Sequence, residues 1–252
     1  MLLAIACYFA GCGKAVEREL KQAVEQTYPM DPTDSFSIRT PNGSVSIYGS
    51  DALEMKLKAV KRAGNAERLK GIAVEVAIRP NSIAIETRFA PEKGLSSSSA
   101  LMVDYTVTLP QSVRITRLDV GNGDLAIVGM RGEDVRATLV NGQLSAKNCF
   151  GNAHLAVANG ALNLLYDWWE QGSFSINGQI TAGNARVTIP RSASFHVNAE
   201  TANGKVINDF SETVELGGRA ATKIDKLVGE GAHPEIRIRA TNGDITIAGF
   251  GL

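Results

Sequence analysis

The chain has 252 residues, which is enough for one large all-β domain or two small ones. Its 26 basic and 26 acidic residues give a formal net charge of zero, so no global field attracts it to nucleic acid, and we expect no nucleic-acid partner. The three scattered cysteines, Cys7, Cys12 and Cys149, provide neither a disulfide framework nor a metal site, and nothing else in the sequence indicates a cofactor.

The chain opens with an apolar run, residues 1–10, which is too short to span a bilayer but fits the core of an export signal. The tetrad ending in Cys12, FAGC, resembles a bacterial lipobox, in which the cysteine after the cleavage point carries the lipid. We therefore expect residues 1–12 to be a signal peptide with a lipobox and Cys12 to be the lipid anchor. Phe9 replaces the usual leucine and no basic residue precedes the run, so a buried strand or an uncleaved signal is the alternative.

The next segment, residues 14–28, carries Val16, Leu20 and Val24 at intervals of four, with charged residues between them. This spacing predicts a short amphipathic helix that two prolines then end. We expect residues 13–34 to be a helical spacer behind the lipid, or a cap on the end of the following domain.

From residue 35 to residue 252 the sequence predicts a single domain of short strands joined by Asn-Gly corners. Glycine has no Cβ and asparagine tolerates the left-handed region, so the pair suits a tight bend. The corners predicted from these pairs are Asn42-Gly43, Asn122-Gly123, Asn141-Gly142, Asn159-Gly160, Asn177-Gly178, Asn203-Gly204 and Asn242-Gly243. Between residues 122 and 203 they recur at intervals of 19, 18, 18 and 26 residues, and we read the last interval as a turn with an insertion. This period favours a single-stranded β-solenoid, or β-helix, over an up-and-down sandwich built with the same turns.

Alternation of apolar with polar or small residues marks the strands on both sides of the corners. Before the first repeats, this pattern predicts strands at 36–48, 53–60, 72–79, 82–89, 101–109 and 113–120, with one or two helical turns at 62–71. After residue 206 the pattern lapses through 211–234 and resumes at 235. We expect the last strands to add a final turn or to cap the end of the stack.

Several of these segments together resemble a known family. They are TPNGSVSIYG at 40–49, AVKRAGNAERLKGIAVEV at 59–76, VTLPQSVRI at 107–115, DVGNGDLAIVG at 119–129 and IRIRATNGDITI at 236–247. They resemble the bacterial putative-adhesin domain of unknown function, common in lipoproteins and envelope-stress operons. The resemblance covers most of residues 35–250 and implies a β-solenoid. It carries over no catalytic or binding residue.

Motifs of the common enzyme classes are absent from the sequence, which has no nucleophile elbow, P-loop, dinucleotide fingerprint or HExxH. His154, His196 and His233 are far apart, and the sequence predicts no metal site. A polysaccharide-cleaving β-helix would need converging carboxylates, yet residues 141–166 contain no Asp or Glu. We therefore expect the protein not to be an enzyme, and keep a polysaccharide-active enzyme as an alternative.

One stretch stands out, Tyr166-Asp167-Trp168-Trp169-Glu170, which holds both tryptophans. Exposed aromatic rings beside carboxylates stack on sugars and mark interaction sites, so Tyr166, Trp168 and Trp169 are the candidate ligand contacts. The alternative is that one tryptophan covers the edge of the solenoid while the other packs under a loop.

The sequence thus favours a non-enzymatic, exported lipoprotein of the cell envelope, facing the periplasm or the cell surface. Its rigid β-solenoid would display an adhesin-like surface to an envelope glycan or a protein partner, and Cys12 would hold it at the membrane. A regulatory accessory of the envelope-stress response that binds a protein is the other reading.

Overall fold

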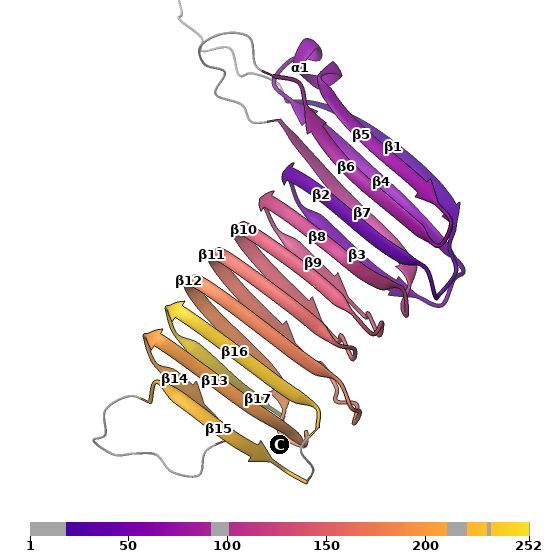
Figure 1. The fold of residues 1–252 in the computed structure, drawn as a ribbon. Coiled ribbons are helices and arrows are strands. Elements are labelled where there is room, and N and C mark those ends of the chain that lie inside the picture. Colours follow the sequence, from indigo (N-terminus) through magenta and orange to yellow (C-terminus); the bar gives the residue numbers. More distant parts are fainter. Residues whose placement is uncertain (1–18, 92–100, 211–220, 231–232, 252) are drawn as a thin grey trace, which may run out of the picture.

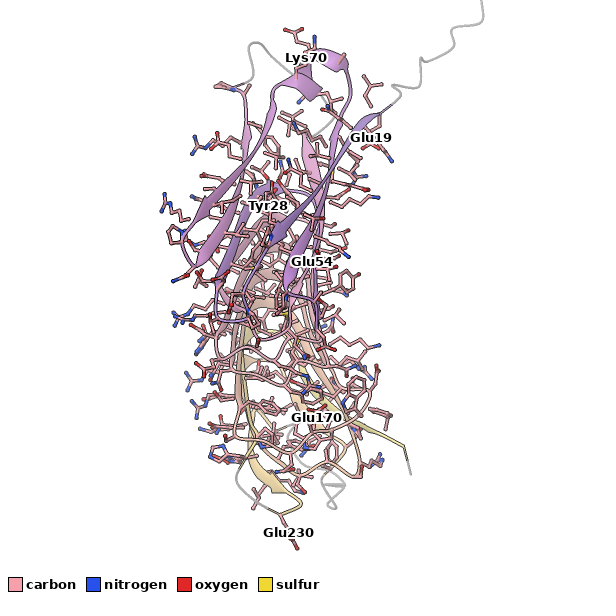
Figure 2. The ribbon with its side chains drawn as sticks, turned by 90° about the vertical axis from the view of Figure 1, so that its right-hand side faces the viewer. Glu19, Tyr28, Glu54, Lys70, Glu170 and Glu230 are labelled. Atoms are coloured by element: carbon pink, nitrogen blue, oxygen red, sulfur yellow. The ribbon has the colours of Figure 1, made fainter. Side chains whose placement is uncertain are left out.

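A computed structural model describes residues 19–91, 101–210, 221–230 and 233–251, in which strands and one short helix form a long stack of flattened turns (Figure 1). The predicted signal peptide and Cys12 lie outside the described residues. No helix in the described ranges is long and apolar enough to cross a membrane. Lys70 and Glu230 mark opposite ends of the stack (Figure 2).

Each turn of the stack crosses the molecule twice. One strand runs to a glycine corner, a second strand returns on the opposite side, and a second corner leads to the next turn. The strands of the seven turns are β2 (Ser35–Asn42), β3 (Val45–Ser50), β8 (Arg114–Asn122), β9 (Leu125–Val128), β10 (Val135–Lys147), β11 (Ala153–Leu165), β12 (Ser175–Pro190), β13 (Phe195–Asn203), β14 (Val206–Asn208), β16 (Glu235–Asn242) and β17 (Ile245–Phe250). The three longest, β10, β11 and β12, bend through the corner and so belong to both sides.

Neighbouring turns pair in parallel and in register, as in Asn141 against Asn159 and Leu144 against Leu162. An up-and-down sandwich would pair these strands antiparallel. The predicted β-solenoid is therefore confirmed. Its two sides are called here the first sheet, which approaches the glycine corners, and the second sheet, which leaves them.

The spatial order of the turns differs from the chain order. The pair β16–β17 lies between β12 and the β13–β14 turn, so the last strands of the chain form the penultimate layer of the stack. The prediction that they would add a final turn or cap the end is wrong. A long connection from residue 209 to residue 234 allows the chain to return and insert this layer between two others.

Antiparallel strands close both ends of the stack. At one end are β1 (Leu20–Pro29), β4 (Glu54–Ala63), β5 (Ile72–Arg79), β6 (Ser82–Phe89) and β7 (Met102–Pro110), and at the other is β15 (Lys223–Val228). β1 pairs antiparallel with β4, β5 with β6, and β15 with β13. Such ends need no further turn to satisfy the backbone of the outermost parallel strands.

The predicted N-terminal helix is wrong over the residues that the structure describes, because Leu20–Pro29 is the strand β1. Its ten residues pair with β4, so tertiary hydrogen bonds override a weak helical preference. An interval of four also places Leu20 and Val24 on the same face of a strand, which makes the pattern ambiguous. The helical turns predicted at 62–71 are confirmed by α1 (Ala66–Lys70), where the Asn65 side chain caps the first turn by accepting from the Arg68 N–H at 2.9 Å.

The core lies between the two sheets, where alternate residues of every strand point inward. Most of its side chains are aliphatic, and the largest are Tyr105, Tyr166, Phe36 and Phe195. Tyr105 shares a hydrogen bond of 2.5 Å with the Thr87 hydroxyl, and burial raises the pKa of its phenol to about 12. The interior is thus continuous and dry along the described stack.

The glycine corners form a column in which each backbone lies directly on the next. A Cβ on Gly160 would stand 1.8 Å from the carbonyl oxygen of Gly142, and φ at Gly160 is +135°. Close approach and a positive φ therefore both require glycine here. Six of the seven predicted Asn-Gly corners are confirmed, at residues 42, 122, 141, 159, 203 and 242.

The seventh predicted corner, Asn177-Gly178, is wrong, because both residues lie within the straight part of β12. The corner of that turn is at Ala182-Gly183, which aligns with Asn159-Gly160 and with Asn242-Gly243. Gly178 faces the core, and a Cβ there would stand 2.7 Å from Leu162 Cδ2 and 2.8 Å from Ile238 Cδ1. Its small size serves packing, not a bend.

The asparagines of the corner form a ladder of side-chain hydrogen bonds along the stack. Asn122 Nδ2 donates to Asn42 Oδ1 at 2.7 Å, Asn141 to Asn122 at 2.8 Å and Asn159 to Asn141 at 3.0 Å. Ala182 interrupts the ladder, which resumes where Asn203 donates to Asn242 at 2.9 Å. The acidic residues after the glycines belong to the same system, since Asp124 and Asp244 accept backbone N–H groups from the next layer.

Candidate binding surface at the aromatic corner

The second corner of each turn lies at the opposite edge of the sheets, and there the regular pattern breaks. From Asn159 to its counterpart Ala182 the chain spans 23 residues, against 18 for the turn from Asn141 to Asn159. The additional residues form the loop 166–174, which contains both tryptophans. This loop and its neighbours are called here the aromatic corner.

Tyr166 is buried, with only 1% of its surface exposed, so it is not available to a ligand in this structure. Its hydroxyl donates to the carbonyl oxygen of Cys149 at 3.1 Å. Burial raises the pKa of Tyr166 well above that of a free phenol and raises the pKa of the Cys149 thiol to about 11. The candidate role of Tyr166 as a ligand contact is therefore wrong, and the residue belongs to the core.

Trp169 is half-buried and packs onto that core. Its ring centroid lies 5.1 Å from that of Tyr166 and 5.7 Å from that of Phe195. Its indole Nε1 donates to the Ser194 carbonyl oxygen at 3.0 Å. The predicted packing of one tryptophan under a loop describes Trp169, which leaves it little surface for a partner.

Trp168 points outward, and 49% of its surface is exposed. Its Nε1 donates to Glu170 Oε1 at 2.9 Å, and the same carboxylate accepts two hydrogen bonds from the guanidinium of Arg131. These bonds, first those from Arg131 and then that from Trp168, lower the pKa of Glu170 to about 2. The exposed indole is therefore held at its polar edge by a carboxylate that stays ionised at neutral pH.

Phe150 completes the aromatic corner beneath these side chains. Its ring lies 6.0 Å from that of Trp168, and the guanidinium carbon of Arg131 lies 5.3 Å from the Phe150 centroid. Asp167 stands beside them in an ion pair with Lys147 at 2.8 Å and also accepts from the Asn148 amide, and both contacts lower its pKa. The site is thus a fixed aromatic ring bordered by paired charges.

Sequence reasoning missed Arg131 and Phe150 as members of this site. They occupy the second corners of the two preceding turns, and Arg131, Phe150 and Trp169 are spaced by the 19-residue period of the first corners. The signal was present, but the second corners carry no repeated dipeptide that would align them.

The histidines and carboxylates do not converge into a metal site, since no group of three or more metal-ligating side chains is close enough within the described ranges. His154 is exposed on the first sheet, as predicted for a solvated strand face. His196 is half-buried, and its Nε2 lies 2.5 Å from Asp225 Oδ1, a contact that lowers the pKa of that carboxyl group. This pair joins β13 to the end strand β15.

The stack of parallel turns, the glycine column and the antiparallel ends agree with a family comparison, in which residues 18–248 match the model of Toastrack DUF4097. The chain belongs to the Toastrack DUF4097 family. The match covers more than nine-tenths of the chain, including both corners of every turn described above, and confirms the resemblance found in the sequence.

Solved structures show that the Toastrack fold of this chain occurs elsewhere. A "putative cell adhesion protein" from Clostridium sporogenes is 15% identical, with a TM-score of 0.54, and the match covers 91% of this chain and 100% of that one. A "putative adhesin" from Bacteroides fragilis is 10% identical, with a TM-score of 0.32, and the match covers 91% and 97% of the two chains. No protein with a curated description matches this chain. At these identities the likeness concerns the fold alone.

Proposed function

We propose that this Toastrack protein is an exported, non-enzymatic binding module of the cell envelope that displays the surface of its stack to a partner. The single observation that carries the proposal is the exposed Trp168, fixed by Glu170 and Arg131 at the corner of a rigid turn. An aromatic ring whose position is already set loses little conformational entropy on binding, which favours affinity for a flat apolar face such as that of a sugar ring.

The titration of the acidic groups supports a binding role over catalysis. A glycoside hydrolase needs a carboxylic acid whose pKa is raised so that it can protonate a leaving group. In the described part of the chain, the Asp and Glu residues with a resolved shift all have a lowered pKa, namely Glu25, Asp31, Glu86, Asp167, Glu170 and Asp225. Each is held ionised by a hydrogen bond to a neighbouring donor.

Substitution of Trp168 by Ala tests the proposal. Tyr48→Ala is the matched control, because Tyr48 is an aromatic residue with 41% exposure on the outer face of the second sheet. We expect wild type and Tyr48→Ala to bind an isolated envelope fraction and Trp168→Ala to lose most of that binding with an unchanged unfolding temperature. Equal binding by all three proteins would refute a role for Trp168.

Digestion of the envelope fraction separates the two kinds of partner. If protease treatment leaves binding intact and glycan digestion abolishes it, the partner is a glycan. The opposite result supports the second candidate, an accessory that binds a protein of the envelope-stress response. The exposed indole serves either partner, since tryptophan is also enriched at the centres of protein interfaces.

Membrane anchoring through Cys12 is a separate part of the proposal. It is supported by the resemblance of residues 9–12 to a lipobox. Labelling cells with a radioactive fatty acid is expected to mark the wild-type protein and leave Cys12→Ala unlabelled. Equal labelling of the two would show that Cys12 is not the anchor.

A further inference from the structure

The outer face of the first sheet carries a straight row of side chains along the stack. Parallel pairing in register places one outward residue of each strand in line with the next. From β2 to β13 the row is Arg39, Asp119, Thr138, Ala156, Gln179, Arg239 and Glu200. Its centre is small and uncharged, whereas both ends carry an arginine beside a carboxylate.

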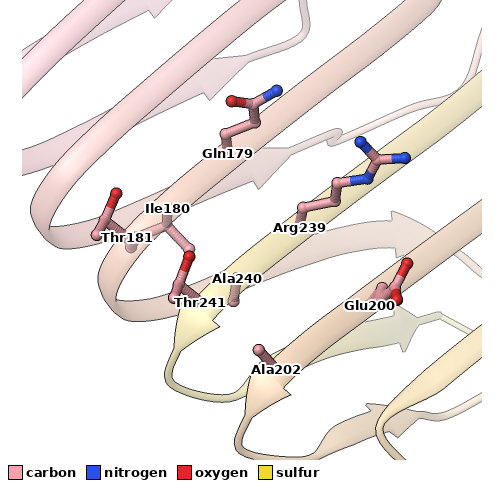
Figure 3. Close-up of a pocket in the computed structure, with 8 residues that line it drawn as sticks. All are labelled: Gln179, Ile180, Thr181, Glu200, Ala202, Arg239, Ala240 and Thr241. Atoms are coloured by element: carbon pink, nitrogen blue, oxygen red, sulfur yellow. The ribbon is translucent and has the colours of Figure 1, made fainter.

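A hollow of about 460 Å³ surrounds the row at Arg239. Figure 3 shows Arg239 and Gln179 projecting from neighbouring strands on the same side of the sheet, with Thr181 and Thr241 nearer the corner. Ala202 lies beside them, where a short side chain leaves room above the backbone. The hollow thus combines a guanidinium, an amide and two hydroxyl groups over a floor of small residues.

A second hollow, of about 730 Å³, lies at the other end of the row. It is lined by Arg39 and by Thr40, Thr138 and Val140, and it also contains the pairs of Arg88 with Glu86 and Arg117 with Asp119. Both hollows open on the same outer face, because their lining strands belong to the first sheet.

The two arginines of the row have no ion-pair partner among the described side chains, although carboxylates flank each of them. Glu200, opposite Arg239, lies 3.7 Å from Lys223 instead. Asp119, opposite Arg39, is paired with Arg117 at 3.1 Å. The guanidinium groups of Arg39 and Arg239 are therefore exposed and free to bind an anion bidentately.

We propose that this row binds a linear polysaccharide that carries carboxylate groups and lies along the stack, with its carboxylates on Arg39 and Arg239. Five steps between strands separate the two arginines, or about 24 Å at the usual spacing of a sheet. The small, neutral residues between them leave space for sugar rings. This inference rests on the proposed function and names the chemical class of its partner.

The chemistry of the face favours a glycan over an acidic peptide. An extended peptide binds a sheet through the free backbone groups of an edge strand. Here the strands of the row pair on both sides, so the face offers side chains alone. Hydroxyl, amide and guanidinium groups are the donors and acceptors that match sugar hydroxyls and carboxylates.

Binding of polygalacturonate to the purified described chain in low salt tests the inference, with dextran as the neutral polysaccharide and polyglutamate as the acidic peptide. We expect the double variant Arg39→Gln/Arg239→Gln to bind polygalacturonate at least about tenfold more weakly than wild type. The matched control is Arg186→Gln, because Arg186 is exposed on β12, has no ion-pair partner among the described residues and faces outward from the second sheet. We expect it to change affinity less than about twofold.

Each other outcome overturns a defined part of the inference. If Arg186→Gln weakens binding as much as the double variant, attraction is general and the row is not a site. If polyglutamate binds as tightly as polygalacturonate, the partner class is wrong, and if dextran does, the arginines have no role. A wild type that binds the envelope fraction but not polygalacturonate refutes this inference alone, whereas binding to neither refutes the proposed function too.

Discussion

The two corners of each turn solve the same geometrical problem in different ways. The glycine corner is identical from turn to turn, with a positive φ and a backbone contact that no Cβ can enter. The aromatic corner varies in length and composition, and in the turn after β11 it extends into the loop 166–174. One edge of the stack is therefore fixed by backbone packing, whereas the other tolerates variation and presents Trp168.

This difference predicts the largest effect for a substitution at the glycine corner. Gly160→Ala places a Cβ 1.8 Å from the Gly142 carbonyl oxygen at a φ of +135°, so neither the residue nor its neighbour can relax. We expect a loss of more than about 3 kcal/mol in the free energy of unfolding, measured by urea denaturation. Gly172→Ala, in the aromatic corner, is the control, because its nearest contact is 3.4 Å from Phe174. Similar losses for the two variants would contradict the distinction between the corners.

A smaller effect is expected at Gly178, which the sequence places at a corner and the structure places in the core. A Cβ here meets the flexible ends of Leu162 and Ile238 at 2.7 and 2.8 Å. These side chains can shift, so Gly178→Ala is expected to cost about 1–3 kcal/mol in the same denaturation experiment. A loss as large as that of Gly160→Ala would indicate that Gly178 bends the chain after all.

The asparagine ladder predicts a change in each direction. Asn141→Ala removes hydrogen bonds of 2.8 and 3.0 Å to Asn122 and Asn159, which we expect to lower the free energy of unfolding by about 1 kcal/mol. Ala182→Asn fills the natural gap between Asn159 and Asn242 and is expected to raise it by up to about the same amount. Thermal unfolding of both variants measures this. Destabilisation by Ala182→Asn would show that the ladder is not limited by its missing member.

The smallest expected effect concerns the pH dependence of the aromatic corner. The pKa of Glu170 is lowered from 4.5 to about 2, so its pairing stabilises the fold above pH 4.5 and is lost as the pH falls through 2. Because the side chain is 38% exposed, we expect Glu170→Gln to cost under about 1 kcal/mol at pH 7. The difference from wild type should shrink steadily between pH 5 and pH 2. A constant difference would assign the effect to packing, and Glu133→Gln, an exposed change in the preceding turn, is the control.

Much of the fold could be predicted because its corners depend on local chemistry. Six Asn-Gly pairs mark real corners, and α1 follows from its own capping asparagine. Gly178 misled because an asparagine happens to precede a glycine whose role is to make room in the core. The true corner at Gly183 lacks the asparagine, so only the alignment of β12 with its neighbours reveals it.

The candidate site was located by its tryptophans, but the role of each aromatic residue depends on burial. Tyr166, Trp168 and Trp169 lie within four residues of one another, and yet the first is buried, the second exposed and the third shared between core and surface. The support from Arg131 and Phe150 arises one and two turns away in the stack. No local pattern records such contacts.

The sequence by itself determined that this protein is a stack of thin turns, because a bend with a positive φ needs glycine and a half-buried strand needs alternation. It did not determine the order of the layers, the strand β1 or the free arginines at the ends of the row. These depend on which segments meet after the chain returns, and such pairing is decided by hydrogen bonds and side-chain packing between residues far apart in sequence.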